Sequence, residues 1–298
     1  MRTLIFGGSG QVGTELKKLV QLNGDVRVVE RREADFSRPQ TIEKLVDEVK
    51  PTRIINAAAY TSVDQAEVEE DLVHQINATA VNALASCAKK YDALLVHYST
   101  DYVFDGAGER PYKEVDKTNP ETVYGQSKLK GEAYIQSSGC RYVILRTSWV
   151  ISATGKNFLK TIMRHALTKD RLRVVNDQIG AVTCAGLIAQ VTDDLIKKDA
   201  VAQIDSGIYH LCSSGEGSWF DVAVYAIKRA SEMGVLLRCD ASNVQPVSSD
   251  QYPVRAVRPK SSKLSTEKLQ RILTNPLPHW KMCVDVTIDE LLMKDFFQ

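Results

Sequence analysis

The first half of the chain alternates short apolar runs with longer segments in which apolar residues recur at helical spacing. The apolar runs predict buried strands, at residues 3–7, 26–30, 53–58, 94–98 and 142–146. The segments between them predict helices, at residues 11–22, 39–49, 71–91 and 121–138. Strands that alternate with helices form parallel sheets with both faces covered. We therefore expect an α/β fold, a Rossmann-like doubly wound parallel sheet.

Beyond about residue 150 this alternation loosens. Helical spacing continues in three segments, at residues 157–168, 185–198 and 218–233. Residues 240–262 are rich in Ser, Pro and Asp and predict a loop. We expect a dinucleotide-binding domain at residues 1–150. Residues 151–298 are expected to form most of a smaller substrate-binding lobe, with some segments returning to the first domain.

Composition and charge narrow the classes of function. The chain has 298 residues, 44% of them hydrophobic and 25% charged, as in an ordinary soluble globular protein. Its net charge of +1 gives no general attraction to nucleic acid, and no apolar run approaches the roughly 18 residues of a membrane span. The six cysteines form no Cys-x-x-Cys pair and the five histidines form no metal-ligand pair. We expect reduced thiols, a cytoplasmic location and no metal.

A glycine turn follows the first predicted strand and precedes the first predicted helix. It contains Gly7, Gly10 and Gly13, with Gln11 and Val12 between the last two. Glycines permit a tight turn in which backbone amides and the helix N-terminus face a phosphate. Such turns also serve simple packing of a strand on a helix. The position between strand and helix favours binding of a dinucleotide cofactor by these five residues.

The end of the second strand carries conflicting signals for the choice of cofactor. Glu30 is placed to accept hydrogen bonds from ribose hydroxyls, which favours NAD. Arg31 and Arg32 follow and can pair with a 2′-phosphate, which favours NADP. We expect NADPH, with NADH also accepted. Asp35 and Phe36 lie either beside the adenine or in a surface loop.

Small residues end the third predicted strand. Ala57, Ala58 and Ala59 let a ligand approach the backbone, although tight helix–sheet packing requires the same residue types. Tyr60 completes this stretch, and we include all four residues in the cofactor site. Asn77 lies inside a predicted helix and is expected to be a solvated or capping residue.

Tyr124 and Lys128 carry the candidate chemistry. Four residues apart on a helix, they share a face, and an ammonium beside a phenol lowers its pKa of about 10. The lysine can also bind the nicotinamide ribose. Thr100, after the fourth strand, offers a hydroxyl to a substrate carbonyl. The combination predicts hydride transfer between a nicotinamide cofactor and a carbonyl, whereas His97 is expected to be a core histidine.

Several motifs together resemble a known family. They are GGSGQVG at 7–13, NAAAYTSVD at 56–64, STDYVFDG at 99–106, YGQSKLKGE at 124–132, RTSW at 146–149, GKNF at 155–158, DQIG at 177–180 and RP at 258–259. The chain resembles the extended short-chain dehydrogenases/reductases and, within them, the dTDP-4-dehydrorhamnose reductase family. The resemblance implies that Thr100, Tyr124 and Lys128 are catalytic. It also implies reduction of the C4 ketone of dTDP-4-dehydro-L-rhamnose to dTDP-L-rhamnose.

The same resemblance implies a site for a nucleotide-diphosphate deoxysugar. Asp101, Tyr102 and Trp149 would line the sugar site, although Trp149 after a strand also fits core packing. Asn157 belongs to the GKNF motif, and the guanidinium of Arg258 could clamp a diphosphate.

Some members of the family dimerise through magnesium. Glu15 fits one metal position, but Asp193 and Asp194 match the other poorly. We expect a homodimer without metal.

Departures from the family pattern leave alternatives open. Ile151 stands where the family usually has Tyr, and Val182 where it usually has Pro, both near the expected sugar pocket. The main rival is reduction of a different nucleotide-linked 4-keto-6-deoxysugar. Tyr102 replaces the Glu that follows Thr-Asp in the 4,6-dehydratases, which argues against water elimination. A different class is a non-catalytic NADP-binding regulatory subunit, like that of methionine adenosyltransferase.

Overall fold

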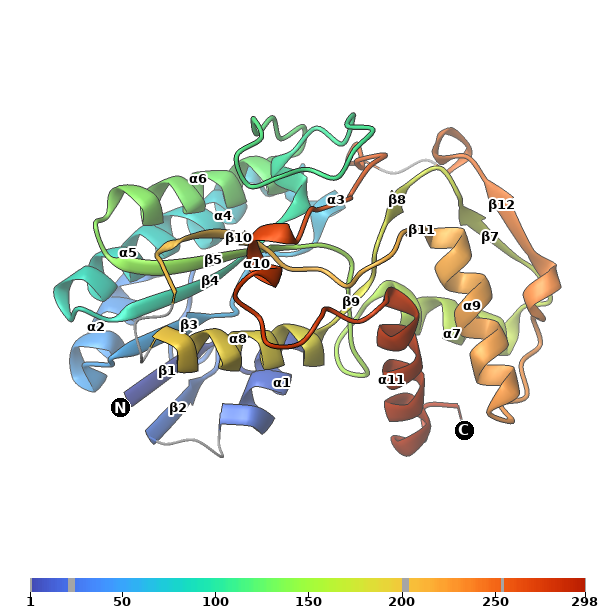
Figure 1. Ribbon diagram of the computed structural model, residues 1–298, viewed down its shortest axis with the longest axis horizontal. Coiled ribbons are helices and arrows are strands. Elements are labelled where there is room, and N and C mark those ends of the chain that lie inside the picture. The colour runs from blue at the N-terminus through green and yellow to red at the C-terminus, as the bar shows by residue number, and fades with distance from the viewer. Residues whose placement is uncertain (1, 21–24, 200–203, 253–254, 298) are drawn as a thin grey trace.

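A computed structural model describes residues 2–20, 25–199, 204–252 and 255–297. Six parallel strands form the main sheet, in the order β10-β5-β4-β3-β1-β2 (Figure 1). They are β1 (Arg2–Phe6), β2 (Asp25–Val29), β3 (Arg53–Asn56), β4 (Leu94–Thr100), β5 (Arg141–Thr147) and β10 (Gly207–His210). The chain runs outward from β1 to β2 and then returns to β3 on the other side of β1. Ligands of such sheets bind at the carboxyl ends of the strands where the order reverses, here β1 and β3.

Helices cover both faces of this sheet. One face carries α1 (Gln11–Val20) and α8 (Ala185–Asp199). The other carries α2 (Pro39–Val49), α4 (Glu70–His74), the π-helix η1 (Gln75–Thr79), α5 (Ala80–Lys90) and α6 (Val123–Ser137). Successive residues of β1 alternate between the two cores: Leu4 and Phe6 pack on the second face and Ile5 on the first. The predicted α/β fold with a parallel sheet is confirmed.

The remaining elements form a second core beside the carboxyl edge of the sheet. Its helices are α7 (Phe158–Thr168), α9 (Trp219–Glu232) and α11 (Trp280–Met293), which lie together on the right in Figure 1. Short strand pairs complete it: β7 (Leu172–Val175) with β12 (Val244–Val247), β6 (Val150–Ile151) with β9 (Thr183–Cys184), and β8 (Ile179–Gly180) with β11 (Gly217–Ser218). Short helices connect the larger elements: α3 (Val63–Ala66), η2 (Asp101–Val103), η3 (Ala241–Asn243), η4 (Ser249–Gln251) and α10 (Glu267–Gln270).

Two parts of the second half differ from the sequence-based expectation. The loop predicted at residues 240–262 is wrong in part, because β12 lies within it and pairs in parallel with β7. Val244 and Val247 are buried, so two apolar residues suffice to anchor this strand despite its polar surroundings. The sequence also gave no prediction for β10 or α11. Since β10 and α8 belong to the main sheet and its cover, the chain returns there after residue 150, while the exact domain division stays a prediction.

The thiols and the membrane test complete the description. All six cysteines are free, as expected, and all but Cys184 are buried. Within the described ranges, no helix combines the length and apolar character needed to cross a bilayer.

Candidate active site

The glycine turn depends on the absence of side chains at two positions. Gly7 has φ of 79°, and a Cβ there would lie 2.6 Å from the backbone of Ala57. A Cβ on Gly13 would lie 2.0 Å from the carbonyl oxygen of Gly7, so only glycine lets α1 start against the turn. The Gly10 amide donates to that same carbonyl at 2.9 Å. The turn therefore forms a cradle of backbone at the carboxyl end of β1, which suits a phosphate.

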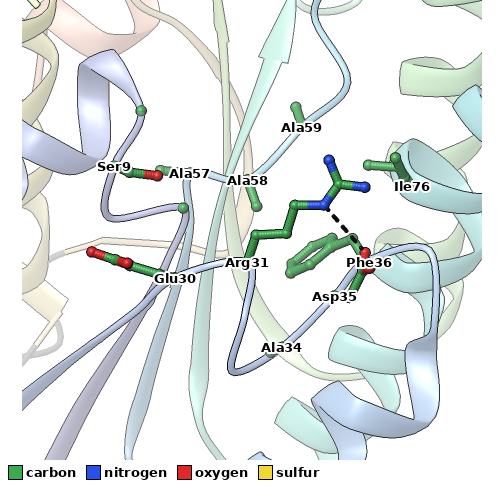
Figure 2. Close-up of a pocket in the computed structure, with 12 residues that line it drawn as sticks. Ser9, Glu30, Arg31, Ala34, Asp35, Phe36, Ala57, Ala58, Ala59 and Ile76 are labelled. Atoms are coloured by element: carbon green, nitrogen blue, oxygen red, sulfur yellow. Dashed lines mark ion pairs between the residues drawn. The ribbon is translucent and has the colours of Figure 1, made fainter. Parts of the chain in front are cut away.

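A cavity of about 210 Å³ opens beside this turn (Figure 2). Nine predicted cofactor residues line it: Gly7, Gly10, Glu30, Arg31, Asp35, Phe36, Ala57, Ala58 and Ala59. Sequence reasoning missed three further lining residues, Ser9, Ala34 and Ile76. Ser9 was open to prediction because it lies inside the glycine turn. Ile76 comes from η1, and the sequence carries no signal that brings this helix to the second strand.

Other predicted cofactor residues have different contacts. The Gln11 side-chain oxygen accepts a hydrogen bond from the Asn157 amide at 2.8 Å. Val12 packs against the core of the sheet, and the Tyr60 hydroxyl donates to Glu69 at 2.7 Å. Gln11 and Asn157 thus connect the glycine turn directly to the lobe.

The residues that bear on cofactor choice are mostly exposed. The Arg31 side chain is 76% exposed, and its Nε lies 3.6 Å from an Asp35 oxygen, the ion pair drawn in Figure 2. A hydrogen bond from the Ser37 amide lowers the pKa of Asp35, which keeps this partner charged. Glu30 and Arg31 point in different directions at the rim. Phe36 is buried and packs edge-on against Phe6, so for this residue the surface-loop alternative is wrong.

Thr100 and Tyr124 meet where β4 ends and α6 begins. The two side chains, called the hydroxyl pair below, lie near enough for the Thr100 hydroxyl to lower the pKa of Tyr124. Thr122 caps α6 by accepting from the Gly125 amide at 3.0 Å, which fixes the start of the helix. A Cβ on Gly125 would lie 2.2 Å from the carbonyl oxygen of Tyr102, so this glycine lets α6 approach η2. The YGQSK stretch therefore sets the distance between the two hydroxyls as well as supplying one.

The electrostatics of Tyr124 differ from the expectation. Burial, with a contribution from the nearby Asp101 charge, raises the pKa of Tyr124 to about 12. The lysine was expected to lower this pKa. Instead, Lys128 Nζ donates to the Tyr98 carbonyl at 2.5 Å and lies 3.1 Å from His97 Nε2. Tyr124 therefore holds its proton at neutral pH.

Lys128 is fully enclosed. The residue is 2% exposed, and burial lowers the pKa of its amine to about 8, against a smaller opposing effect of Glu132. Glu132 accepts from the Ser99 hydroxyl at 2.5 Å and forms a two-point ion pair with Arg146 at 2.9 and 2.6 Å. A charged pair under α6 thus holds the helix on β4 and β5.

Asn77 contradicts its predicted role. It is 1% exposed, not solvated. Its oxygen accepts from the Tyr60 amide at 2.9 Å, and its amide donates to the Ser127 hydroxyl at 3.1 Å. A Cβ on Gly131 would lie 2.4 Å from the Asn77 carbonyl oxygen, so η1 and α6 touch backbone to backbone there. An Asn in an apolar helix and a Gly in its partner were the only signals of this junction in the sequence.

Asp101 and Tyr102 adjoin the hydroxyl pair. Thr100 Oγ1 donates to Asp101 Oδ1 at 3.0 Å, and the Tyr102 ring packs edge-on against Tyr124 with centroids 5.6 Å apart. Burial raises the pKa of Asp101 to about 6. Arg258 Nη2 pairs with Asp64 Oδ2 at 2.8 Å, near enough for both charges to act on Tyr102. The structure therefore brings these five predicted residues to one place, together with Asp64, which was not predicted as a site residue.

Trp149 lies at the junction of sheet and lobe. Its φ of 48° is left-handed, an uncommon conformation for a residue with a side chain. Its ring stacks on Trp219, with centroids 3.6 Å apart and planes at 13°, and Phe158 adjoins the pair. Trp219 thus belongs to the packing of the lobe, and it supports a residue predicted to contact the sugar.

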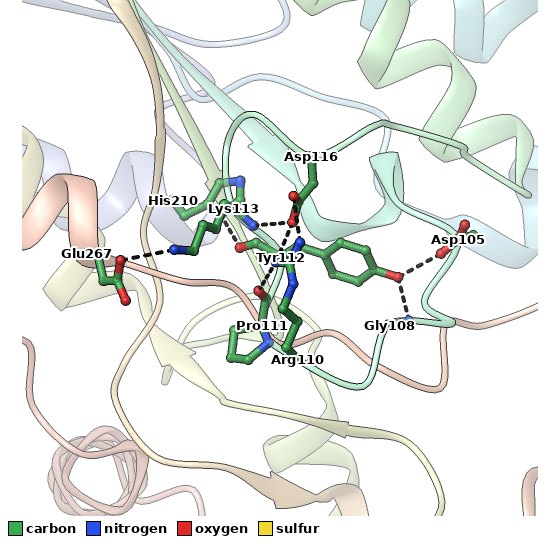
Figure 3. Close-up of polar contacts among 9 residues, drawn as sticks. All are labelled: Asp105, Gly108, Arg110, Pro111, Tyr112, Lys113, Asp116, His210 and Glu267. Carbon is green, nitrogen blue, oxygen red and sulfur yellow. Dashed lines mark hydrogen bonds and ion pairs between the residues drawn. The ribbon is translucent and has the colours of Figure 1, made fainter.

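A polar loop follows the STDYVFDG motif and ties it to the sheet (Figure 3). The Tyr112 hydroxyl donates to Asp105 at 2.7 Å, and its carbonyl oxygen lies 3.1 Å from His210 Nδ1 on β10. Arg110 pairs with Asp116 through both carboxylate oxygens at 2.8 and 2.9 Å. These contacts fix the chain that leaves η2.

Comparisons with known proteins agree with this arrangement. A family model described as RmlD substrate binding domain matches residues 1–293. The dTDP-4-dehydrorhamnose reductase of Escherichia coli is 40% identical over 295 residues, 98% of each chain. The crystal structure of the Bacillus anthracis dTDP-4-dehydrorhamnose reductase in complex with NADP is 32% identical, with a TM-score of 0.89 over 97% of this chain and 99% of that one.

A more distant structure shares the fold alone. The UDP-glucose 4-epimerase of Thermus thermophilus, in complex with NAD, is 20% identical with a TM-score of 0.79 over 98% of this chain and 99% of that one. The fold and the site define an extended short-chain dehydrogenase/reductase. Within that class the chain belongs to the dTDP-4-dehydrorhamnose reductase family, and the resemblance predicted from the motifs is confirmed.

Proposed function

We propose that this chain reduces the C4 ketone of dTDP-4-dehydro-L-rhamnose to dTDP-L-rhamnose, with NADPH as the preferred hydride donor and NADH as an alternative. The observation that carries the proposal is the hydroxyl pair of Thr100 and Tyr124, backed by buried Lys128, at the same sheet edge as the glycine turn. The bound nicotinamide would supply the hydride. Relatives named dTDP-4-dehydrorhamnose reductase, at about 40% identity over nearly the whole chain, support the same reaction.

The side chains divide the work on the ketone. Thr100 would turn its hydroxyl hydrogen from Asp101 to the ketone oxygen, and this hydrogen bond would hold the carbonyl carbon in position. As the carbon gains a hydride, the oxygen becomes an alkoxide, and Tyr124 would give it the proton that completes the alcohol. The pKa of about 12 suits this role, because the phenol keeps its proton until the more basic alkoxide forms. Asp101 would accept a hydrogen bond from a sugar hydroxyl.

The cofactor cradle fits a phosphorylated dinucleotide. Gly7 and Gly13 leave room that a Cβ would fill, and Arg31 lines the same cavity with an exposed guanidinium. This cation is placed to pair with a 2′-phosphate, which supports NADPH. The NADP found with the Bacillus anthracis relative supports it further.

The departures from the family pattern do not weaken the choice of sugar. Ile151 and Val182 are completely buried and pack in the core of the lobe. These two substitutions therefore change the side-chain packing of the lobe core, while Tyr102 and Asp101 remain beside the hydroxyl pair. This supports dTDP-4-dehydro-L-rhamnose over a different nucleotide-linked 4-keto-6-deoxysugar.

The test is NADPH oxidation with enzymatically prepared dTDP-4-dehydro-L-rhamnose, with product identified by mass and by sugar NMR. Turnover to dTDP-L-rhamnose is expected. Faster turnover of another nucleotide-linked 4-keto-6-deoxysugar would reassign the substrate. Binding of NADPH without oxidation by any 4-ketosugar would favour a regulatory subunit instead.

The proposal includes a homodimer in the cytoplasm. Six free thiols suit a reducing compartment, and the dimer follows the habit of the resembled family. Light scattering on the purified protein measures the oligomer, and a monomer at working concentration would contradict it. Cell fractionation tests the location.

A further inference from the structure

A line of buried polar contacts leads from the cofactor cradle to Lys128. The Ala58 amide donates to Asn56 Oδ1 at 3.1 Å, and Asn56 Nδ2 lies 3.0 Å from His97 Nδ1. His97 Nε2 in turn lies 3.1 Å from Lys128 Nζ. Asn56 is 1% exposed, His97 0% and Lys128 2%, so water does not compete for these bonds. Neither Asn56 nor His97 has a part in the proposed proton transfer.

The orientation of the Asn56 amide follows from its neighbour. A backbone N–H can only donate, so the side-chain oxygen of Asn56 must face Ala58. The amide nitrogen then faces His97, and because it carries hydrogens, it donates to His97 Nδ1. His97 Nδ1 is therefore the acceptor and carries no proton.

The proton of His97 must then lie on the other ring nitrogen. Complete burial, together with the adjacent lysine, lowers the pKa of His97 well below its usual value, so the ring is neutral. A neutral imidazole with an acceptor at Nδ1 has its hydrogen on Nε2, and this N–H points at Lys128 Nζ. A neutral amine can accept that hydrogen with its lone pair while donating to the Tyr98 carbonyl. If Lys128 were an ammonium, one of its N–H groups would instead face the N–H of His97 Nε2, and two donors would oppose each other.

The other titratable groups around Lys128 do not oppose this strongly. On α6, Glu132 favours the ammonium, but its charge is matched by Arg146 from β5 at 2.6 Å. Tyr124 keeps its proton and is neutral. From β4 the Lys128 amine has the His97 ring and the Tyr98 carbonyl oxygen as polar partners. At η2, Asp101 lies beside Thr100 and Tyr124 and acts on the tyrosine.

We propose that His97 is a positioning residue for Lys128, and that Asn56 fixes its tautomer so that the Nε2–H favours the amine of Lys128 over the ammonium. The backbone of the cofactor cradle thereby sets the protonation of the lysine behind the acid. Burial of the amine acts in the same direction, toward a pKa of about 8. The catalytic meaning of Lys128 rests on the proposed function, whereas the tautomer of His97 and the protonation of Lys128 do not.

The tautomer is measured on the wild-type, full-length protein. Imidazole ¹⁵N shifts distinguish a ring nitrogen that carries hydrogen from one that does not. We expect one histidine with hydrogen on Nε2 throughout the neutral range, assigned to His97 by its loss in His97→Gln. Hydrogen on Nδ1 would overturn the proposal. This result is read from the wild-type protein, and the His97→Gln variant serves only to assign the signal.

The protonation of Lys128 is measured by titrating lysine ¹³Cε signals, assigned with Lys128→Met. Wild type should titrate well below the ~10.4 of an ordinary lysine. Asn56→Asp places an acceptor opposite Nδ1 and moves the hydrogen there, so the pKa of Lys128 should rise by about one unit or more. His97→Gln can turn its amide oxygen to the ammonium and should raise that pKa too.

A double variant separates the tautomer from simple charge. If Asn56→Asp acts through the ring, most of its shift should vanish in the His97→Gln background. A shift that persists there in full would overturn the proposal, as would a wild-type lysine that titrates normally. Lower melting temperatures with an unchanged Lys128 titration would assign both residues a purely structural role. Reductase activity is not part of these readouts, so their failure is distinct from failure of the proposed function.

Discussion

The cofactor cradle and the hydroxyl pair lie at one sheet edge, but the cradle consists of backbone and the hydroxyl pair of side chains. The cradle is backbone: Gly7 and Gly13 matter because they have no side chain, and the charge at its rim, Arg31, is largely exposed. The chemical end is a set of buried side chains, in which Lys128 and Glu132 are almost completely enclosed. Exposed charges are screened by water, whereas buried ones act strongly on their neighbours. Changes at the cradle should therefore alter affinity, and changes at the chemical end should alter rate and pH dependence.

The sharpest break in this comparison is Tyr124→Phe, which removes the proton donor and keeps the ring. We expect kcat to fall by about 10²–10⁴-fold, the usual worth of a positioned acid, with little change in NADPH affinity. Stopped-flow reduction and fluorescence titration with NADPH measure the two quantities. Tyr134→Phe, on the same helix but away from the site, is the matched control and should behave as wild type. Comparable losses in both variants would remove Tyr124 from the acid role.

Gly13→Ala tests whether the backbone shape of the cradle determines cofactor affinity. Its Cβ would meet the Gly7 carbonyl oxygen at 2.0 Å, so the turn must shift. Shifts forced by overpacking typically cost about 1–3 kcal/mol, and we expect a rise in the NADPH Kd of roughly 10–100-fold. The control is Gly186→Ala, where nothing lies within 4 Å of the added carbon. An unchanged Kd for Gly13→Ala would show that the cofactor does not use this turn.

Asp101→Asn addresses the pH dependence that a buried carboxylate implies. Its pKa is raised to about 6, so the carboxylate is present above that pH and is protonated below it. If the ionised form binds the sugar, kcat/KM should fall about tenfold per unit of pH below 6. The Asn variant should lose this limb and about 10-fold or more of kcat/KM at neutral pH. The exposed control Asp71→Asn should keep the fall in kcat/KM below pH 6. If Asp101→Asn keeps this fall as well, the titration belongs to another group.

The two ends also differ in how far the sequence predicts them. Periodicity locates the sheet and the glycine turn because both depend on residues close together in the chain. The placement of Tyr124 against Thr100 followed from motifs, but the pKa of the phenol did not, since it depends on where Lys128 points. Asn77 was misjudged for the same reason: its partners, Tyr60 and Ser127, lie 17 and 50 residues away. Residue type and spacing predict backbone shape, whereas buried hydrogen bonds are set by tertiary contacts.

The smallest expected effect concerns the rim of the cradle and would sharpen the comparison most. Arg31 lines the cavity and Arg32, the next residue, does not, although both are exposed and each has an acidic neighbour at 3.6 Å. Arg31→Ala should raise the NADPH Kd by about 10-fold, because one exposed charged hydrogen bond to a 2′-phosphate is worth roughly 1–2 kcal/mol.

The affinity of the Arg31→Ala variant for NADH, which has no 2′-phosphate, should stay the same. Arg32→Ala removes an equal charge one residue further on and should change neither Kd by more than about twofold. Binding titrations at two salt concentrations measure these constants, since a screened rim contact weakens as salt rises. Equal losses for Arg31→Ala and Arg32→Ala would mean that the rim acts through its overall charge. A loss confined to Arg31→Ala and NADPH would place the choice of cofactor in one side chain, beside a cradle that otherwise recognises by shape.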